Sequence, residues 1–244
     1  MNFYVSQTQF GKTEQFALQV ARGQIQGHTS FNISGYNGNV SSTFIPIWEN
    51  NTAYTYPTTA QNMTLYSSSA SDTNVLVSIS GLDASYHIIS ENLLLDNGTT
   101  GVQTLKQYFR ITSVIVIDGV NPVGNLTLSN TGKTIVYAKV LAGSGRSAMT
   151  IYTVPAGHTF YLAKVNCFCD QSNNQVSNYR SYTINSSGIV TTILQAPFTQ
   201  NYISDKSVPR GYPEKTDIQW QCKSSAISQI GLQIEGVLVK TVID

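Results

Sequence analysis

Charged side chains are scarce in this sequence. They make up 11% of the 244 residues, against roughly 25% in an average soluble protein. The 14 Lys and Arg residues nearly balance the 13 Asp and Glu residues, so the formal net charge is +1 at pH 7. Proteins that bind nucleic acids through the phosphates need a basic surface. We therefore expect no nucleic-acid partner and a surface that is polar but mostly uncharged.

Long apolar runs are absent as well. No window approaches the ~20 apolar residues that cross a membrane as a helix. The first residues, Met1–Gly11, include Asn2, Ser6 and Gln7 where a secretory signal would need an apolar stretch. We therefore expect a soluble protein that is made in a cytoplasm and has no membrane partner.

Cysteine is rare, with three residues in the chain: Cys167, Cys169 and Cys222. Cys167 and Cys169 are two apart in an alternating run, which puts them on one face of a strand about 6.6 Å apart. That separation is too large for a disulfide without kinking the strand. We expect three buried free thiols, no metal and no cofactor. A metal site with His158 or Asp170 as a further ligand is the alternative, although the Cys-x-x-Cys spacing of structural zinc sites is missing.

Residues with catalytic chemistry are also few. Of the three histidines, His87 and His158 each follow a turn, and no Gly-x-Ser-x-Gly motif is present. A glycosidase needs two carboxylates about 5–10 Å apart, but most acidic residues here neighbour turn formers and suit Asx turns. These turn acids are Asp83, Asp96, Asp118 and Asp205. We therefore predict no catalytic residues and no enzymatic activity.

Short strand patterns separated by turn residues are the main feature of the sequence. A strand, a Gly, Asp or Pro turn and a second strand recur at residues 81–90 and 153–162. No segment of ten residues keeps a helical apolar period without a break. The fold class is therefore predicted to be all-β. The expected strands include 16–20, 43–48, 63–66, 75–80, 86–95, 108–117, 126–128, 134–140, 149–154, 159–169, 179–184, 189–194, 217–222 and 231–242.

A Gly/Pro/Asn stretch at residues 118–125 interrupts the strand pattern near the middle of the chain. Such a stretch is typical of a linker. We therefore expect two consecutive β-sandwich or jelly-roll-like domains, 14–118 and 126–244, joined by a linker at 119–125. Residues 1–13 have no periodicity and are expected to form an extended N-terminal arm.

Aromatic residues outside the strand patterns are the candidate interface residues. Phe3, Tyr4 and Phe10 in the arm would anchor it on another subunit, or belong to a frayed terminus. The cluster Trp48, Tyr54 and Tyr56 suits a core, an interface or a carbohydrate platform. The stretch 195–216 has three prolines and no strand pattern, so it is expected to be a long functional or partner-packed loop. That loop contributes the last two candidates, Tyr202 and Tyr212.

Five segments stand out in order along residues 17–165: Leu18–His28, Trp48 with Tyr54–Pro57, Gly81–Tyr86 leading into Ile89–Glu91, Tyr108–Arg110 and Ile151–Gly157. With this order and spacing, the chain resembles a family of virion structural proteins found in tailed phages of marine and other bacteria. The last third of the chain matches by its β pattern. The resemblance implies a place on the virion rather than a chemistry, and it leaves open the capsid surface, a head fibre or the tail.

Composition and resemblance together predict a non-enzymatic capsid decoration (cement) protein that stabilises the phage head. Its expected partners are the major capsid protein or other virion proteins, and a homo-oligomer such as a trimer is expected. It would be made in the host bacterial cytoplasm and reside in the virion. The alternative is a tail or head fibre component that recognises host surface glycans. An enzyme acting on those glycans is the remaining third reading.

Overall fold

The computed structural model describes residues 5–7, 13–170 and 175–241, which form eighteen strands and one short helix. This arrangement confirms the expected all-β class. In β6 (Val75–Leu82), Val75, Val77 and Ile79 are buried while the residues between them are half-buried. Such alternation is what a pleated strand with one face in a core requires.

Two antiparallel sheets form one half of the molecule. The first has the order β16 (Asn201–Tyr212), β13 (His158–Cys169), β18 (Ser228–Lys240) and β3 (His28–Val40). The second has the order β12 (Ile151–Thr153), β17 (Asp217–Ser224), β14 (Ser177–Ile184) and β15 (Val190–Phe198), and β4 (Ile45–Pro46) also pairs with β17. Buried side chains from both sheets, including Phe160, Trp220 and Ile234, form one hydrophobic cluster, which we call the sandwich cluster.

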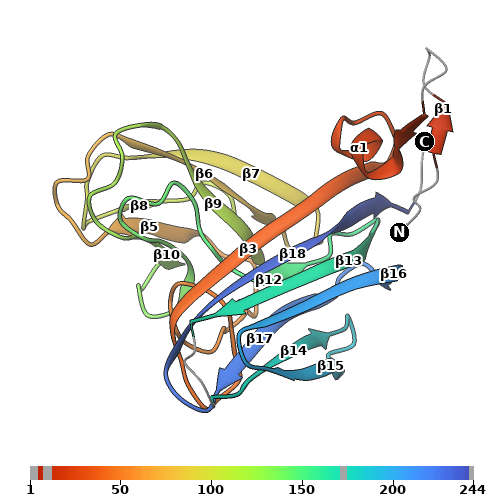
Figure 1. The fold of residues 1–244 in the computed structure, drawn as a ribbon. Coiled ribbons are helices and arrows are strands. Elements are labelled where there is room, and N and C mark those ends of the chain that lie inside the picture. The colour runs from red at the N-terminus through yellow and green to blue at the C-terminus, as the bar shows by residue number, and fades with distance from the viewer. Residues whose placement is uncertain (1–4, 8–12, 171–174, 242–244) are drawn as a thin grey trace.

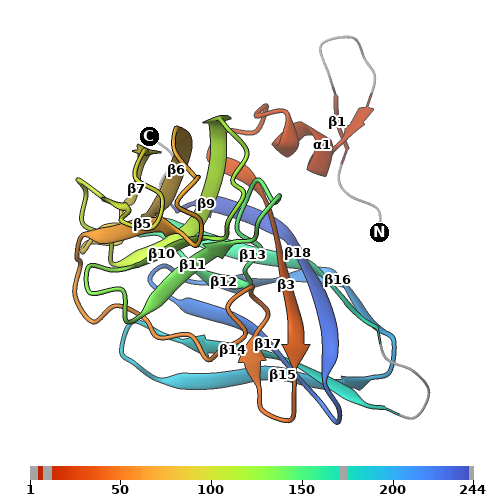
Figure 2. The same cartoon turned by 90° about the vertical axis from the view of Figure 1, so that its left-hand side faces the viewer.

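Two smaller sheets form the other half of the molecule (Figures 1 and 2). One has the order β11 (Val136–Val140), β10 (Leu126–Asn130), β5 (Met63–Ser67) and β8 (Val102–Gln103). The other has the order β7 (Ile88–Leu95), β6 and β9 (Arg110–Gly119). Their buried side chains belong to a second cluster between residues 48 and 151, which we call the inserted cluster.

The expected linker at 119–125 does not coincide with the division between these clusters. β10, which follows it, pairs with β5, and both strands belong to the inserted cluster. The residues of the sandwich cluster come from before residue 48 and from after residue 151. These two parts of the chain are joined by strand pairing, since β3 pairs with β18. The Gly/Pro/Asn stretch is a turn within one core, and residues 48–151 are an insertion into the sandwich rather than one of two consecutive units.

The two turns that the repeated pattern predicts are present. Between β6 and β7, a side-chain oxygen of Asp83 accepts hydrogen bonds from the amides of Ser85 and His87, at 2.8 and 2.9 Å. Between β12 and β13, Gly157 has a φ of +71°, a conformation that glycine adopts without strain. Each turn therefore forms through the residue types that predicted it: an Asp side chain that caps the first turn and a glycine with positive φ in the second.

The expected loop at 195–216 is instead a pair of long strands. β15 and β16 lie in different sheets and are joined at Thr199 and Gln200. The sequence pattern did not indicate these two strands, because both are edge strands with few buried apolar positions. Pro197 lies in an edge strand, and Pro209 lies where the register between β13 and β16 shifts. Both are positions where a strand tolerates proline.

The N-terminal region also differs from expectation. The sequence pattern predicts a strand at 16–20, but Phe16–Ala21 forms the short helix α1, followed by Gly23 with a φ of +69°. Leu and Ala favour a helix, and glycine ends it. Of the expected arm, the structure describes β1 (Val5–Gln7), which pairs with β2 (Thr13–Gln15).

Candidate interface and the junction between the clusters

The outer face of the sheet β16-β13-β18-β3 is an open strand surface of the sandwich half. Figures 1 and 2 place β14, β15 and β17 on one side of this sheet. On β13, Phe160 and Leu162 point to that side and are buried, whereas Tyr161 and Phe168 are 39% and 48% exposed. The alternation of a strand directs Tyr161 to the opposite face.

Exposed apolar and aromatic side chains lie on this outer face among polar ones. By strand register, Tyr36 of β3 and Phe168 of β13 flank Gly231 of β18 in one row. Ile203 of β16 lies opposite Asn166 in the next row and is 57% exposed. Few charges interrupt the face, and the expectation of an uncharged polar surface fits its composition.

The charged side chains on the outer face gather in a single row. Lys164 of β13 is in register with Glu235 of β18 on one side and with Asp205 of β16 on the other. Opposite charges directly across neighbouring strands favour this pairing. The row holds one cation and two anions, so the outer face as a whole presents only a small net charge to a partner.

The structure does not bring the sequence-derived interface candidates together on a surface. Phe3, Tyr4 and Phe10 lie outside the described residues. Trp48 and Tyr54 are only 1% and 9% exposed and pack edge to face with ring centroids 5.1 Å apart, and Tyr56 continues the cluster. Of the three readings of this cluster, its packing matches the core.

The two tyrosines from the supposed loop point inward from β16. Tyr212 is buried and stacks on Phe160 at 5.9 Å, and half-buried Tyr202 stacks on Tyr179 at 5.0 Å. The residues that the sequence reasoning missed are Tyr36, Tyr161, Phe168 and Ile203. Alternation within residues 159–169 could have identified Tyr161, because its neighbours are apolar and face the core.

A buried ion pair joins the two clusters. Arg110 of β9 donates from Nε and Nη2 to the two carboxylate oxygens of Asp217 of β17, each at 2.8 Å. The guanidinium also lies over the rings of Phe109 and Tyr56, at 4.0 and 4.7 Å, and donates to the carbonyl oxygen of Pro57. Burial alone would lower the pKa of Arg110, but the hydrogen bonds and charge of Asp217 raise it.

Four of the five segments that stand out along residues 17–165 meet at this junction. Tyr56 and Arg110 belong to two of them; Tyr86, with its ring 5.7 Å from the guanidinium, belongs to a third. Thr153, from the fourth, donates its hydroxyl to Asp217 at 2.5 Å. A Cβ at Gly81 would collide with the backbone of Arg110. Every polar group of the ion pair is thus engaged in hydrogen bonds.

The described residues contain no cluster of three or more His, Cys, Asp or Glu side chains that could hold a metal ion. Cys167 and Cys222 are buried with their Sγ atoms 3.7 Å apart, Cys169 is half-buried, and none of the three forms a disulfide within the described residues. Nδ1 of His87 lies 3.6 Å from Asp83 in an exposed turn. Within the described part of the chain, no helix is long and apolar enough to span a membrane.

The carboxyl group of Glu49 is buried without a basic side chain in contact among the described residues. Glu49 is 8% exposed and accepts a hydrogen bond from the amide of Ala148 at 3.2 Å. Burial raises the pKa of Glu49 to about 7, although this hydrogen bond and the charge of Lys139 oppose the shift. The residue directly follows Trp48, which belongs to the inserted cluster.

No model of a known protein family matches the chain, and no curated protein matches its sequence. Among solved structures, it is similar to a mutant VP2 protein of infectious bursal disease virus in derived T=1 particles, at 9% identity and a TM-score of 0.18. That alignment covers 89% of this chain and 74% of the other. A chain from the infectious bursal disease virus Gt strain aligns at 11% identity and a TM-score of 0.18, covering 87% and 72%. At such TM-scores, neither alignment establishes a shared fold.

Proposed function

We propose that this chain is a non-enzymatic structural protein of a phage virion, and that it decorates and stabilises the capsid. The observation that carries the proposal is the open outer face of the sheet β16-β13-β18-β3. It combines a nearly uncharged polar surface with exposed Tyr36, Tyr161, Phe168 and Ile203. Aromatic anchors in a polar surround are typical of protein interfaces.

Two features of the chain support a structural rather than a catalytic role. The most elaborate polar arrangement, Arg110 with Asp217, is fully engaged in joining the two clusters. The face also lacks a charge excess that would direct it to phosphates. The partner that suits such a surface is the major capsid protein or another virion protein.

Binding of the purified protein to virions stripped of it tests the proposal. Phe168→Ser and Tyr161→Ser should each weaken binding about tenfold or more, because they remove exposed aromatic anchors from the face. Leu94→Ser is the matched control, since Leu94 on β7 is 45% exposed but lies in the other half. Binding should change little between 50 and 500 mM salt, because few charges take part.

Two outcomes would contradict the proposal. One is equal weakening by the Leu94→Ser control, which would exclude the outer face as the contact. The other is binding to host cells or their surface glycans but not to stripped particles. That result would favour a fibre or tail component that recognises the host.

A further inference from the structure

The sandwich half is open along one side, between β15 and β16. Among the described strands, β16 pairs only with β13 and β15 pairs only with β14, so each ends its sheet. The two strands are consecutive in the chain, but in the described part of the chain no strand pairing joins them. In Figure 1 they run along the same side of the molecule. Edge strands present unpaired backbone groups to which an extended segment can add.

A small cavity lies in this opening. Its volume is about 140 Å³, and its walls come from both sheets. Leu162 and Val165 of β13 and Ile193 and Leu194 of β15 supply apolar surface. An apolar cavity of roughly 150 Å³ accommodates a benzene ring. The space therefore suits one apolar side chain rather than a larger ligand.

Polar and cationic groups line the remainder of the cavity. Tyr212 and Ser181 lie side by side with their hydroxyl oxygens 3.4 Å apart. Lys206 and Arg210 of β16 also line it, and neither forms an ion pair within the described residues. Lys206 contacts the Ser204 hydroxyl at 3.4 Å, and the Arg210 guanidinium lies 5.9 Å from the ring of Tyr212. Two cations beside an apolar cavity are complementary to a carboxylate next to an apolar group.

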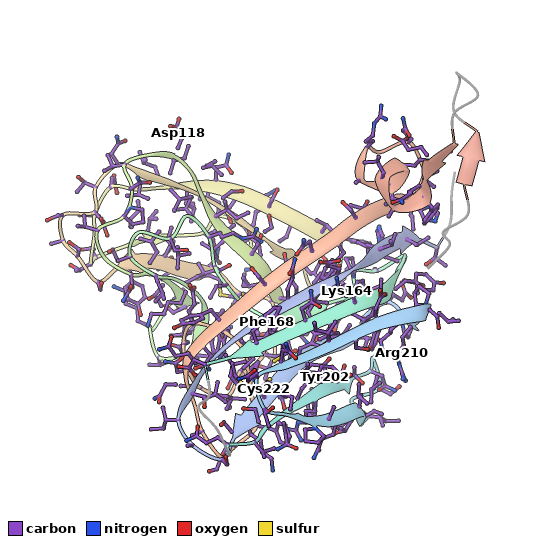
Figure 3. The ribbon with its side chains drawn as sticks, in the orientation of Figure 1. Asp118, Lys164, Phe168, Tyr202, Arg210 and Cys222 are labelled. Atoms are coloured by element: carbon purple, nitrogen blue, oxygen red, sulfur yellow. The ribbon has the colours of Figure 1, made fainter. Side chains whose placement is uncertain are left out.

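We propose that the opening between β15 and β16 binds an extended segment of a partner protein. An apolar side chain of that segment fills the cavity, and an Asp or Glu side chain meets Lys206 and Arg210. In an extended chain, residues two apart share a face, so the acidic residue lies two positions from the apolar one. This inference does not depend on the proposed virion role, because its binding surface is separate from the outer face of the sheet. Figure 3 shows Tyr202 and Arg210 along β16, with Lys164 on the neighbouring strand.

Two pools of capped heptapeptides test the proposal. Each has Leu, Ile, Val or Phe at the third position and Thr, Ser or Gly elsewhere, with Asp at the fifth position in one pool and Asn in the other. We expect the Asp pool to shift the methyl NMR signals of Leu162, Ile193 and Leu194 in a saturable way. The Asn pool should bind about tenfold more weakly, because it lacks the carboxylate.

Variants separate this site from general charge effects. The double variant Lys206→Gln with Arg210→Gln should reduce affinity for the Asp pool about tenfold and leave the Asn pool unchanged. Lys164→Gln, on the outer face of the neighbouring strand, should change neither. A small acid, 4-methylpentanoate, should bind far more weakly than the Asp pool because it makes no backbone hydrogen bonds to the edge strands.

Three results would overturn the inference. The first is no methyl shift with either pool up to millimolar concentration. The second is equal binding of the Asp and Asn pools, which would remove the role of Lys206 and Arg210. The third is binding of 4-methylpentanoate as tight as that of the peptides, which would assign the cavity to a small acid instead of a polypeptide.

Discussion

At the scale of single residues, the Arg110–Asp217 pair joins segments that lie far apart in the sequence. Arg110 comes from the inserted cluster and Asp217 from the sandwich, so one bidentate contact fixes one half against the other. The surrounding rings of Tyr56 and Phe109 cover the guanidinium and exclude water. A buried ion pair of this kind destabilises a protein strongly when one partner is removed.

Asp217→Asn tests the contribution of this pair. We expect the free energy of unfolding to fall by about 3–5 kcal/mol, because the Arg110 charge remains buried without its partner. Urea titration followed by circular dichroism measures the change. Asp118→Asn, at an exposed acid, should alter stability by less than about 0.5 kcal/mol. A loss below about 1 kcal/mol for Asp217→Asn would show that the junction contributes little.

Glu49 makes stability depend on pH. Its pKa in the folded protein is about 7, above the ordinary value of 4.5. Between pH 4.5 and pH 7, the Glu49 carboxyl group is therefore protonated in the folded state but ionised in the unfolded state. The free energy of unfolding consequently falls as pH rises from about 4.5 through 7. Glu49→Gln should remove this slope and stabilise the protein at pH 8 by up to about 3 kcal/mol. Urea midpoints at pH 5 and pH 8 provide the check, and an unchanged slope in the variant would contradict it.

At the scale of elements, strand pairing and turn formation were predictable to different degrees. The turns after β6 and β12 could be predicted because Asp83 and the Pro155–Gly157 segment act locally. The insertion of residues 48–151 could not, because pairing of β3 with β18 depends on contacts far apart in the chain. β16 was missed because its exposed residues carry no apolar alternation.

For the outer face, the sequence predicted the overall polarity but not which residues lie on it. A polar and mostly uncharged surface follows from composition, and the outer face has that character. Which aromatic residues occupy it depends on which face of each strand is buried. Trp48 and Tyr212 are as aromatic as Tyr36 and Phe168, yet the packing of the two clusters buries the first pair and exposes the second.

Asp72 ties the turn at 119–125 to the inserted cluster. Its carboxylate accepts hydrogen bonds from the amides of Val123 and Gly124, at 2.7 and 2.9 Å, and from the Ser67 hydroxyl. Burial alone would raise the pKa of Asp72, but these hydrogen bonds lower it below 3.8. The stability that they contribute is thus present above pH 3.8 and is lost as pH falls through the lower folded value.

Asp72→Ala should destabilise the protein by about 1–3 kcal/mol, since it leaves buried donors without an acceptor. Hydrogen exchange at the amides of Val123 and Gly124 should accelerate more than exchange in β13. Asp96→Ala, at an exposed acid in a neighbouring turn, should have little effect on either measurement. Unchanged protection of the two amides would show that Asp72 does not hold this turn.

At the scale of the whole molecule, two β clusters joined by a buried ion pair present two different surfaces to partners. The outer face of the sheet β16-β13-β18-β3 is broad and nearly uncharged, whereas the opening between β15 and β16 is narrow and cationic. A rigid β scaffold holds surface side chains in place without the loss of freedom that a flexible segment would suffer on binding. This arrangement suits a subunit that reinforces an assembly by binding it in many copies.

The most direct measurement compares virions with and without this protein. A protein that binds the assembled lattice better than free capsid subunits stabilises the shell in proportion to its occupancy. Particles assembled without it should therefore release DNA at a lower temperature than complete particles, should regain stability when purified protein is added, and should adsorb normally to host cells. Particles that are equally heat-stable without it but fail to adsorb would contradict the decoration role and indicate a receptor-binding one.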